Sequence, residues 1–245
     1  TRGAALRTHS LGDDARETLS GEANDQITNL MDIDRTPELL TWVFGGLFGR
    51  KQCADVFIPS RNIAAVATVG GGCFWCLEAL YQELQGVVSV TSGYAGGTLA
   101  DPTYKQVLTG KTGHAEVVQV EFDVSVLSYR DVLQIFMSSH DPTTRNRQGN
   151  DRGPQYRSII LTHDEQQRAE AEQVLEEANR DRWFGWKVCT ELAPLQAFYR
   201  AEAVHQRYYA RNPSVAYCAY VVTPKLLEFR RKYAAKLKLQ PAADD

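Results

Sequence analysis

The sequence lacks a hydrophobic run long enough to cross a membrane. Its longest apolar stretch, residues 39–49, is eleven residues long and is interrupted by Thr41 and a glycine pair, whereas a spanning helix needs about 20 apolar residues. It also lacks a strong charge of either sign, since the net charge over 245 residues is −3. No basic field is available to attract nucleic acid. We therefore expect neither a membrane span nor a nucleic-acid partner.

Cysteine is too scarce for a small secreted fold held together by disulfides. There are five cysteines in 245 residues, an odd number that contains one close pair, Cys73 and Cys76. This usage predicts thiol chemistry in a reducing compartment, either the cytoplasm or an organelle. The chain begins with Thr1 rather than Met, which is consistent with a processed leader, so targeting is not read from its start.

Hydrophobic residues are frequent enough, at 43%, to build a sizeable core. Residues 1–38 differ from the rest, because they contain eight acidic and four basic residues and few large apolar ones. We expect residues 1–60 to be an N-terminal extension, partly disordered, with one short apolar helix over residues 40–48 that packs on the main domain. The main domain is expected over residues 61–238, with a flexible tail over 239–245.

Periodicity in the main domain predicts a mixture of strands and helices. Alternating or continuous apolar residues predict strands at 65–69, 87–92, 118–122, 157–161 and 188–192. Helical spacing predicts helices that begin near Cys73, Ser128, Asp164 and Thr223. This order predicts an α/β or α+β fold, a two-layer sandwich in which helices cover a mixed sheet.

The strongest local motif is Gly70-Gly71-Gly72-Cys73-Phe74-Trp75-Cys76. It predicts a strand, a glycine turn and then a helix that starts at Cys73, where unpaired N–H groups and the helix dipole favour a thiolate. Phe74 and Trp75 predict an apolar wall for a small alkyl group. Three other interpretations stay open: a phosphate cradle without the P-loop lysine, half of a zinc site without its second cysteine pair, and two inert buried cysteines.

Three further segments carry candidate site residues. Glu116 stands at the head of a strand in Thr112-Gly113-His114-Ala115-Glu116, and a carboxyl in an apolar pocket beside Cys73 would have a raised pKa and could donate a proton. A solvated carboxylate is the alternative. Tyr94 lies between glycines, and residues 145–156 form a long polar loop, which is typical of a site rather than of a core.

These segments occur in a recognisable order: GGGCFW, GYAGG, GHAE, HDPT and RQGNDRGPQYRS, followed by HQRYY, NP and YC. Over about residues 62–220 the chain resembles the type A peptide-methionine sulfoxide reductases. One departure is Cys76, because the commonest family motif has Gly after Phe-Trp. The resemblance implies a ferredoxin-like core. It also implies thiol-dependent reduction of the S epimer of methionine sulfoxide, free or in proteins, and hence protein repair.

The resemblance also implies a role for each matching residue. Cys73 would be the nucleophile and Glu116 the proton donor. The substrate oxygen would be held by the hydroxyls of Tyr94 and Tyr156, with Asp151 organising the site and with Phe74 and Trp75 around the methyl group. The product is methionine and a sulfenic acid on Cys73. An external dithiol, usually thioredoxin, then reduces the resulting disulfide, so no metal, flavin or nucleotide is implied, and we expect a monomer.

The cysteine that resolves the sulfenic acid is less well defined by the sequence. Cys218 is favoured because many family members carry their first recycling cysteine in this C-terminal segment, and Cys76 is second. Cys53 lies in the extension, and we expect Cys189 to be a small buried residue in the strand 188–192. His205 is expected to be structural.

Two other functions stay open from the sequence. A thioredoxin-like dithiol oxidoreductase that uses Cys73 and Cys76 would need no Glu116. A non-catalytic module for oxidised or methyl-bearing peptides would tolerate the loss of Cys73.

Overall fold

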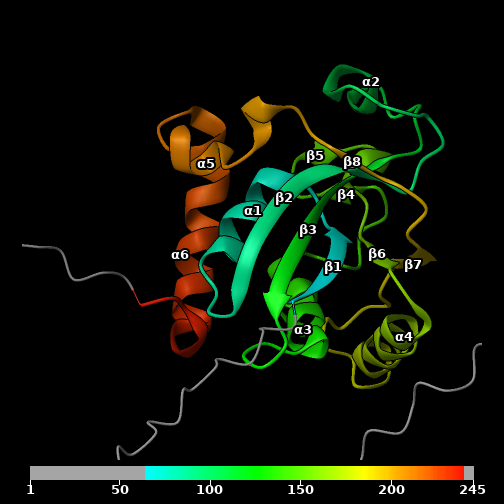
Figure 1. Ribbon diagram of the computed structural model, residues 1–245, viewed down its shortest axis with the longest axis vertical. Coiled ribbons are helices and arrows are strands. Elements are labelled where there is room, and N and C mark those ends of the chain that lie inside the picture. Colours follow the sequence, from blue (N-terminus) through cyan, green and yellow to red (C-terminus); the bar gives the residue numbers. More distant parts are fainter. Residues whose placement is uncertain (1–63, 240–245) are drawn as a thin grey trace, which may run out of the picture. The chain divides into compact units, whose positions relative to one another are not determined.

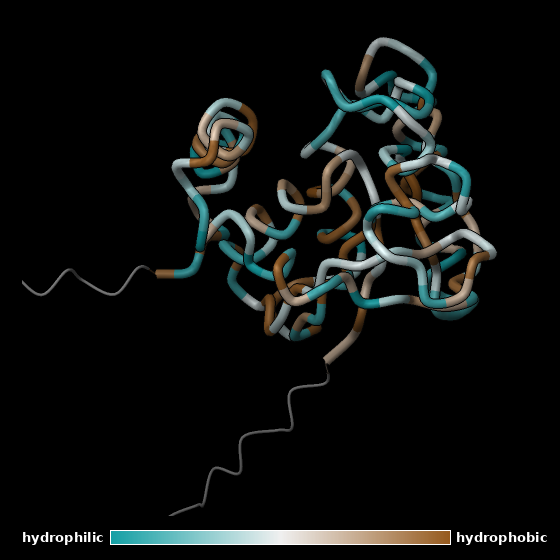
Figure 2. Tube along the Cα trace, turned by 90° about the horizontal axis from the view of Figure 1, so that it is seen from above, coloured by the Kyte–Doolittle hydropathy of each residue, from teal (hydrophilic) through white to brown (hydrophobic). Residues whose placement is uncertain are grey.

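A computed structural model describes residues 64–239 of the chain. The expectations for residues 1–60, for Cys53 and for the tail beyond Leu239 lie outside the described residues. Hydrophobic and hydrophilic residues alternate at short intervals along the described chain (Figure 2). Within residues 64–239, none of the helices combines the length and the hydrophobicity that a membrane span needs.

The described residues form strands and helices close to those that the sequence predicts. The strands are β1 (Ala64–Gly70), β2 (Val87–Ala95), β3 (Ala115–Asp123), β4 (Arg147–Gln148), β5 (Asp151–Arg152), β6 (Ile159–Thr162), β7 (Glu191–Pro194) and β8 (Phe198–Arg200). The helices are α1 (Phe74–Gln82), α2 (Tyr104–Leu108), α3 (Tyr129–Ser139), α4 (Glu165–Arg180), α5 (Tyr208–Arg211) and α6 (Thr223–Lys232). Short strands β4 and β5 form a hairpin in the polar loop.

The larger sheet has the strand order β7-β6-β1-β3-β2-β8. All of its pairs are antiparallel except β6 with β7. Helix α1 connects β1 to β2 across β3, and α3 connects β3 to β6 (Figure 1). The four central strands, in the order β6-β1-β3-β2 with two helical crossovers, therefore form the βαββαβ arrangement of ferredoxin-like folds. The predicted two-layer sandwich is confirmed.

The two faces of the sheet are covered differently. Val118, Val120 and Phe122 of β3 belong to the main core cluster, together with the buried residues of α1 and α3. The alternate residues of β3, Ala115 and Val117, belong to a smaller cluster on the opposite face. Because side chains of a strand alternate between faces, Glu116 lies on the face that the helices cover.

Helix starts agree with the sequence prediction where a polar cap was recognised. Ser128 caps α3 through a capping box with Asp131, and the Asp164 side chain accepts the Gln167 N–H at the start of α4.

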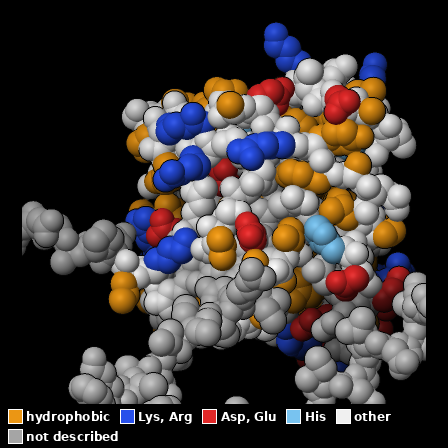
Figure 3. Space-filling view, viewed as in Figure 1, with side chains coloured by type: hydrophobic (Ala, Val, Ile, Leu, Met, Phe, Trp, Pro, Cys, Tyr) orange, Lys and Arg blue, Asp and Glu red, His pale blue; other side chains and the backbone are white. Residues whose placement is uncertain are grey.

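Basic side chains gather on one side of the molecule. Figure 3 shows Lys and Arg side chains on the left of the viewed face, the side on which Figure 1 draws α5 and α6. The last turn of α6 carries three basic residues, Arg230, Arg231 and Lys232.

The prediction for Cys189 is wrong. Strand β7 pairs with β6 only from Glu191 onward, so Cys189 precedes it and is exposed. Its backbone N–H donates to the Pro142 carbonyl at 2.7 Å, and its thiol donates to the Thr143 carbonyl at 3.2 Å. These bonds to the preceding loop hold Cys189 outside the sheet and outside the core.

Methionine is nearly absent from the chain, which has two. Met137 is the methionine that falls within residues 64–239, and its side chain in α3 is fully buried. The Thr190 hydroxyl lies 3.9 Å from its sulfur.

Candidate active site

Cys73 lies at the glycine turn between β1 and α1. It is the N-cap residue of α1 and is 8% exposed. Gly72 has φ +94°, a conformation that L side chains rarely adopt, and a Cβ there would lie 2.6 Å from the Gln148 side chain. A Cβ at Gly70 would lie 2.6 Å from the Glu116 carbonyl oxygen. The glycines therefore allow the turn to approach both the polar loop and the head of β3.

Glu116 is joined to the start of α1 by one hydrogen bond. The Phe74 N–H donates to Glu116 Oε2 at 3.1 Å, while the buried Oε1 finds no donor among the described residues. Burial raises the pKa of Glu116 to about 8, and the bond from Phe74 opposes that rise. At neutral pH this carboxyl is mainly protonated, so it has a proton to donate beside Cys73.

Burial also raises the pKa of Cys73 well above its ordinary value, which differs from the thiolate that its helix-start position predicts. The Trp75 N–H does lower the pKa, as a helix terminus should, but desolvation is larger. The Cys76 N–H donates to the Cys73 carbonyl at 3.1 Å, and the neighbouring Cys73 thiol lowers the pKa of Cys76. The two thiols therefore form a contacting pair in which Cys73 keeps its proton.

The structure brings two tyrosines close to these groups. Tyr104 and Tyr156 both have pKa values raised by burial and then by the neighbouring charges of Glu116 and Cys73. Tyr104 was missed as a site residue by sequence analysis. A sequence signal for its helix exists, because Thr103 and Gln106 form a capping box around Tyr104.

The Tyr94 hydroxyl is engaged with a different group. Tyr94 is opposite Glu116 in the β2–β3 pairing, but its hydroxyl donates to Glu202 Oε2 at 2.7 Å. The other oxygen of Glu202 accepts the Tyr104 N–H at 2.8 Å. Tyr94 thus connects through Glu202 to the backbone of Tyr104.

Asp151 comes from the β4–β5 hairpin and is tied to the C-terminal segment. The Tyr217 hydroxyl donates to Asp151 Oδ2 at 2.7 Å, and the nearby Tyr217 also lowers the pKa of Cys76. Tyr217 therefore binds the loop acid and lies near the second thiol. Sequence analysis identified Tyr217 only as part of a family motif.

Aromatic rings surround Phe74 and Trp75 at the start of α1. The Trp75 indole stacks on Tyr208 with a centroid distance of 3.8 Å and an interplanar angle of 9°, and the edge of Tyr217 meets it at 5.8 Å. His205 lies 5.5 Å from the Phe74 ring. Burial lowers the pKa of His205, so it contributes a neutral ring to this wall.

Cys218 is also buried. It begins a π-helical turn, Cys218–Val222, that leads directly into α6. Burial raises the pKa of Cys218, and the charge of Cys76 raises it further. Cys76 thus has Cys73 and Cys218 as thiol neighbours, whereas Cys189 lies against a separate loop.

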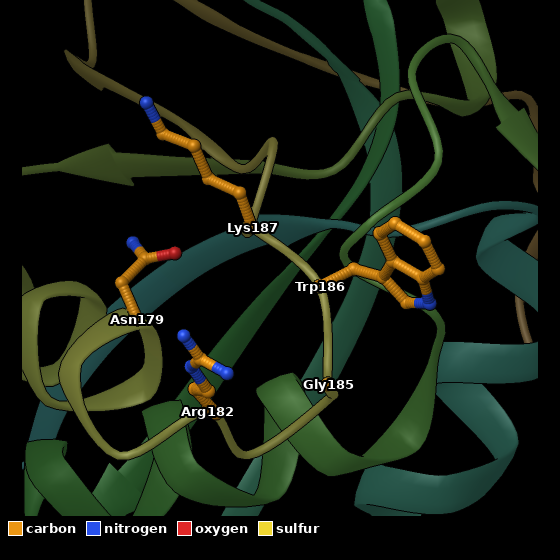
Figure 4. A pocket seen from close by; sticks show the side chains of 5 residues that line it. All are labelled: Asn179, Arg182, Gly185, Trp186 and Lys187. Carbon is orange, nitrogen blue, oxygen red and sulfur yellow. The ribbon is translucent and has the colours of Figure 1, made fainter.

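A hollow at the C-terminal end of α4 has a different lining (Figure 4). It is bounded by Asn179, Arg182, Gly185, Trp186 and Lys187, which supply neither a thiol nor a carboxyl. In Figure 4 the Trp186 ring points away from Asn179 and Arg182. In the part of the chain that the structure describes, no three His, Cys, Asp or Glu side chains are arranged to hold a metal ion.

Comparisons with known proteins agree on one family. The family model described as peptide methionine sulfoxide reductase matches residues 65–238. The peptide methionine sulfoxide reductase MsrA of Saccharolobus solfataricus is 52% identical over 174 residues, which cover 71% of this chain and 97% of that protein. The MsrA of Polynucleobacter asymbioticus is 51% identical over 187 residues, which cover 76% of this chain and 98% of that protein.

Solved structures give the same result. Methionine sulfoxide reductase A of Corynebacterium diphtheriae has a TM-score of 0.61 at 36% identity, covering 64% of this chain and 78% of that chain. Reduced Mxr1 of Saccharomyces cerevisiae has a TM-score of 0.60 at 35% identity, covering 63% of this chain and 89% of that chain.

Proposed function

The chain belongs to the peptide methionine sulfoxide reductase family, and on that premise we propose which of its residues carry the reaction. It is an oxidoreductase that reduces methionine sulfoxide to methionine. The observation that supports the residue roles is the state of Glu116. Its carboxyl is buried and protonated, has one unpaired oxygen, and accepts a hydrogen bond from Phe74, the residue next to Cys73. Its substrate is the S epimer, free or in proteins.

The substrate methyl group binds against the aromatic wall of Phe74 and Trp75. Its oxygen points to Glu116, where the hydroxyls of Tyr104 and Tyr156 are the available donors, because both phenols lie near Glu116 and Cys73. Donors placed where negative charge develops stabilise the transition state. Tyr94, predicted from the sequence to hold the oxygen, supports this arrangement by fixing Glu202 and thereby Tyr104.

The Cys73 sulfur attacks the sulfoxide sulfur while Glu116 protonates the oxygen. The S–S bond formed by this attack and the substrate S–O bond then both break as the hydroxyl group passes to the Cys73 sulfur, where an S–OH bond forms. Two electrons pass to the methionine sulfur, and the thiol proton of Cys73 restores the proton that Glu116 gives up. The products are methionine and a Cys73 sulfenic acid. Asp151, held by Tyr217, organises the polar side of the site.

Cys76 is the resolving thiol that the geometry supports. It lies one helical turn from Cys73 in the resting enzyme, and its pKa is lowered by the Cys73 thiol, which increases the thiolate fraction that attacks. Attack on the sulfenic sulfur forms the Cys73–Cys76 disulfide and releases water. Cys218, which the sequence favours as the resolving thiol, then attacks the Cys76 sulfur of this disulfide, because Cys76 is its thiol neighbour. This thiol–disulfide exchange forms a Cys76–Cys218 disulfide. This exchange returns Cys73 to the thiol.

An external dithiol completes the cycle by reducing the remaining disulfide. Thioredoxin is the proposed partner, and the electrons come from thiols alone, so no prosthetic group takes part. A reaction that depends on reduced thiols supports a reducing compartment. We place the catalytic domain over residues 61–238, acting as a monomer.

The test is turnover of each epimer of methionine sulfoxide with dithiothreitol, followed by chromatographic measurement of methionine. The S epimer should be reduced and the R epimer left intact. Cys73→Ser should abolish the reaction, whereas Cys189→Ser, at an exposed thiol away from the site, should not affect it. Reduction of insulin disulfides without reduction of either epimer would support the dithiol oxidoreductase instead. Epimer binding without turnover would support the binding module.

A further inference from the structure

Glu78 is a buried carboxylate that the proposed chemistry does not use. It lies in α1, one turn beyond Trp75, and is 1% exposed among apolar residues. A buried carboxylate destabilises a fold unless hydrogen bonds compensate for its lost hydration. The position therefore calls for a specific partner.

The partners of Glu78 are two successive backbone N–H groups 129 and 130 residues away. The Arg207 N–H donates to Oε1 at 2.8 Å, and the Tyr208 N–H donates to Oε2 at 3.3 Å. Arg207 has φ +52° and ψ 38°, the left-handed conformation that non-glycine residues adopt rarely and at some cost. Both oxygens of Glu78 thus fix the backbone at the residue where the chain turns into α5.

This turn places Tyr208, the first residue of α5, against Trp75. Its ring stacks on the Trp75 indole at 3.8 Å. Trp75 and Glu78 are three residues apart in α1 and so lie on the same helix face. The Glu78 carboxylate therefore holds the backbone of Tyr208, and the Trp75 indole holds its ring.

We propose that Glu78 is a positioning residue that holds Tyr208 against Trp75 and thereby fixes the wall of the pocket for the substrate methyl group. This proposal rests on the proposed function, because it assigns Trp75 to substrate binding. Without the two bonds to Glu78, Arg207 leaves its left-handed conformation, the Tyr208 ring moves off the indole, and Trp75 becomes mobile. Affinity for the small sulfoxide then falls more than the rate of the chemical step.

A double-mutant cycle with free methionine S-sulfoxide and dithiothreitol tests this coupling. Glu78→Gln keeps the side-chain volume but replaces one acceptor by an NH₂ group, and Tyr208→Ala removes the ring. Each change should raise KM about two- to tenfold, the range expected for an aromatic contact, with a smaller change in kcat. The double variant should show no more than the larger single effect, because both changes remove the same contact.

Trp75 emission gives an independent readout. In a background with Trp42, Trp183 and Trp186 changed to Phe, Glu78→Gln should shift the emission of Trp75 to the red and increase its quenching by acrylamide. The matched control is Glu83→Gln, which removes an ion pair with Arg230 beyond the end of the same helix. The control should leave KM and emission unchanged.

Additive effects of Glu78→Gln and Tyr208→Ala on KM would overturn the proposal. If Glu78→Gln does not fold, Tyr208→Ala alone decides, and an unchanged KM in that variant overturns the proposal. These failures leave wild-type turnover of the S epimer intact. Absence of that turnover in the wild-type protein would instead contradict the proposed function.

Discussion

The protonation state of Glu116 is set by burial rather than by a charged partner. Desolvation is the largest cause of its raised pKa, and the strongest opposing cause is a single backbone N–H. A carboxyl that accepts several N–H bonds would ionise well below neutral pH. Burial, opposed by few donors, is therefore the reason that this residue keeps a proton at the pH where it must donate one.

Glu116→Gln should lower the rate of the reductase step by about 10²–10⁴-fold, the usual contribution of general acid catalysis. For the wild type, kcat/KM should decline as the pH rises through about 8, because the acid form is then lost. The variant should lack this decline. Single-turnover methionine release across pH 6–10 measures both effects, and a loss below about threefold would remove Glu116 from the mechanism.

The raised pKa of Glu116 also makes the free energy of unfolding depend on pH. The folded-state pKa of Glu116, about 8, lies above the ordinary value of 4.5, so the folded state binds the proton more tightly than the unfolded state does. The free energy of unfolding should therefore fall as the pH rises from about 4.5 to about 8. Denaturant titrations should show that the wild type loses stability relative to Glu116→Gln over this range. Parallel curves for the two proteins would contradict the raised pKa.

Either Tyr94, as the family motif implies, or Tyr104, as we propose, donates to the substrate oxygen. Removing one hydroxyl at a time distinguishes these two assignments. Tyr104→Phe removes a donor to the substrate oxygen and should lower kcat/KM by about tenfold, or ~1.4 kcal/mol. Tyr94→Phe should have a smaller effect, because that hydroxyl acts through Glu202. Steady-state kinetics of both variants decide between them. A larger loss for Tyr94→Phe would restore the assignment made from the family motif.

At the scale of elements, the relay depends on how two helical segments present their thiols. Cys73 and Cys76 are fixed one turn apart at the start of α1, a spacing that suits the usual 4.4–6.8 Å between the Cα atoms of a disulfide. Cys218 is buried at the start of a π-helical turn, where the Thr223 N–H bonds to the Cys218 carbonyl. Cys76 is therefore carried by the same helix as Cys73, whereas Cys218 is carried by a separate helical segment.

Mass mapping after one equivalent of substrate should find the Cys73–Cys76 disulfide in Cys218→Ser. In Cys76→Ser, a dimedone adduct should accumulate on Cys73, because the nearest thiol is gone. Cys189→Ser is the matched control and should behave as the wild type does. A Cys73–Cys218 disulfide that forms at the wild-type rate in Cys76→Ser would instead identify Cys218 as the first resolving thiol.

Sequence patterns located most elements because their causes are local. Apolar alternation placed β3, and polar caps placed the starts of α3 and α4. Strand β7 was predicted three residues too early, because its first residue is set by pairing with β6. Tyr104 was missed for a similar reason: only the folding of β2 and residues 201–205 brings Glu202 to its backbone. Long-range pairing of this kind leaves no periodic signal in the sequence.

At the scale of the whole molecule, the reaction should not require residues 1–60. The Saccharolobus solfataricus relative aligns over 97% of its own length with only 71% of this chain, and the family model begins at residue 65. A protein that starts at residue 61 should keep kcat/KM close to that of the full chain when both are assayed with free methionine S-sulfoxide. A loss of about tenfold or more would assign residues 1–60 a part in catalysis.

The burial of Met137 protects the enzyme from its own chemistry. A protein that reduces oxidised methionine in other proteins becomes a substrate for its neighbours if it exposes a methionine that oxidants can reach. Met137 has no exposed surface, so its sulfur can acquire oxygen only when α3 opens. Oxidants therefore create neither a competing substrate within residues 64–239 nor a polar sulfoxide in the core that supports the site.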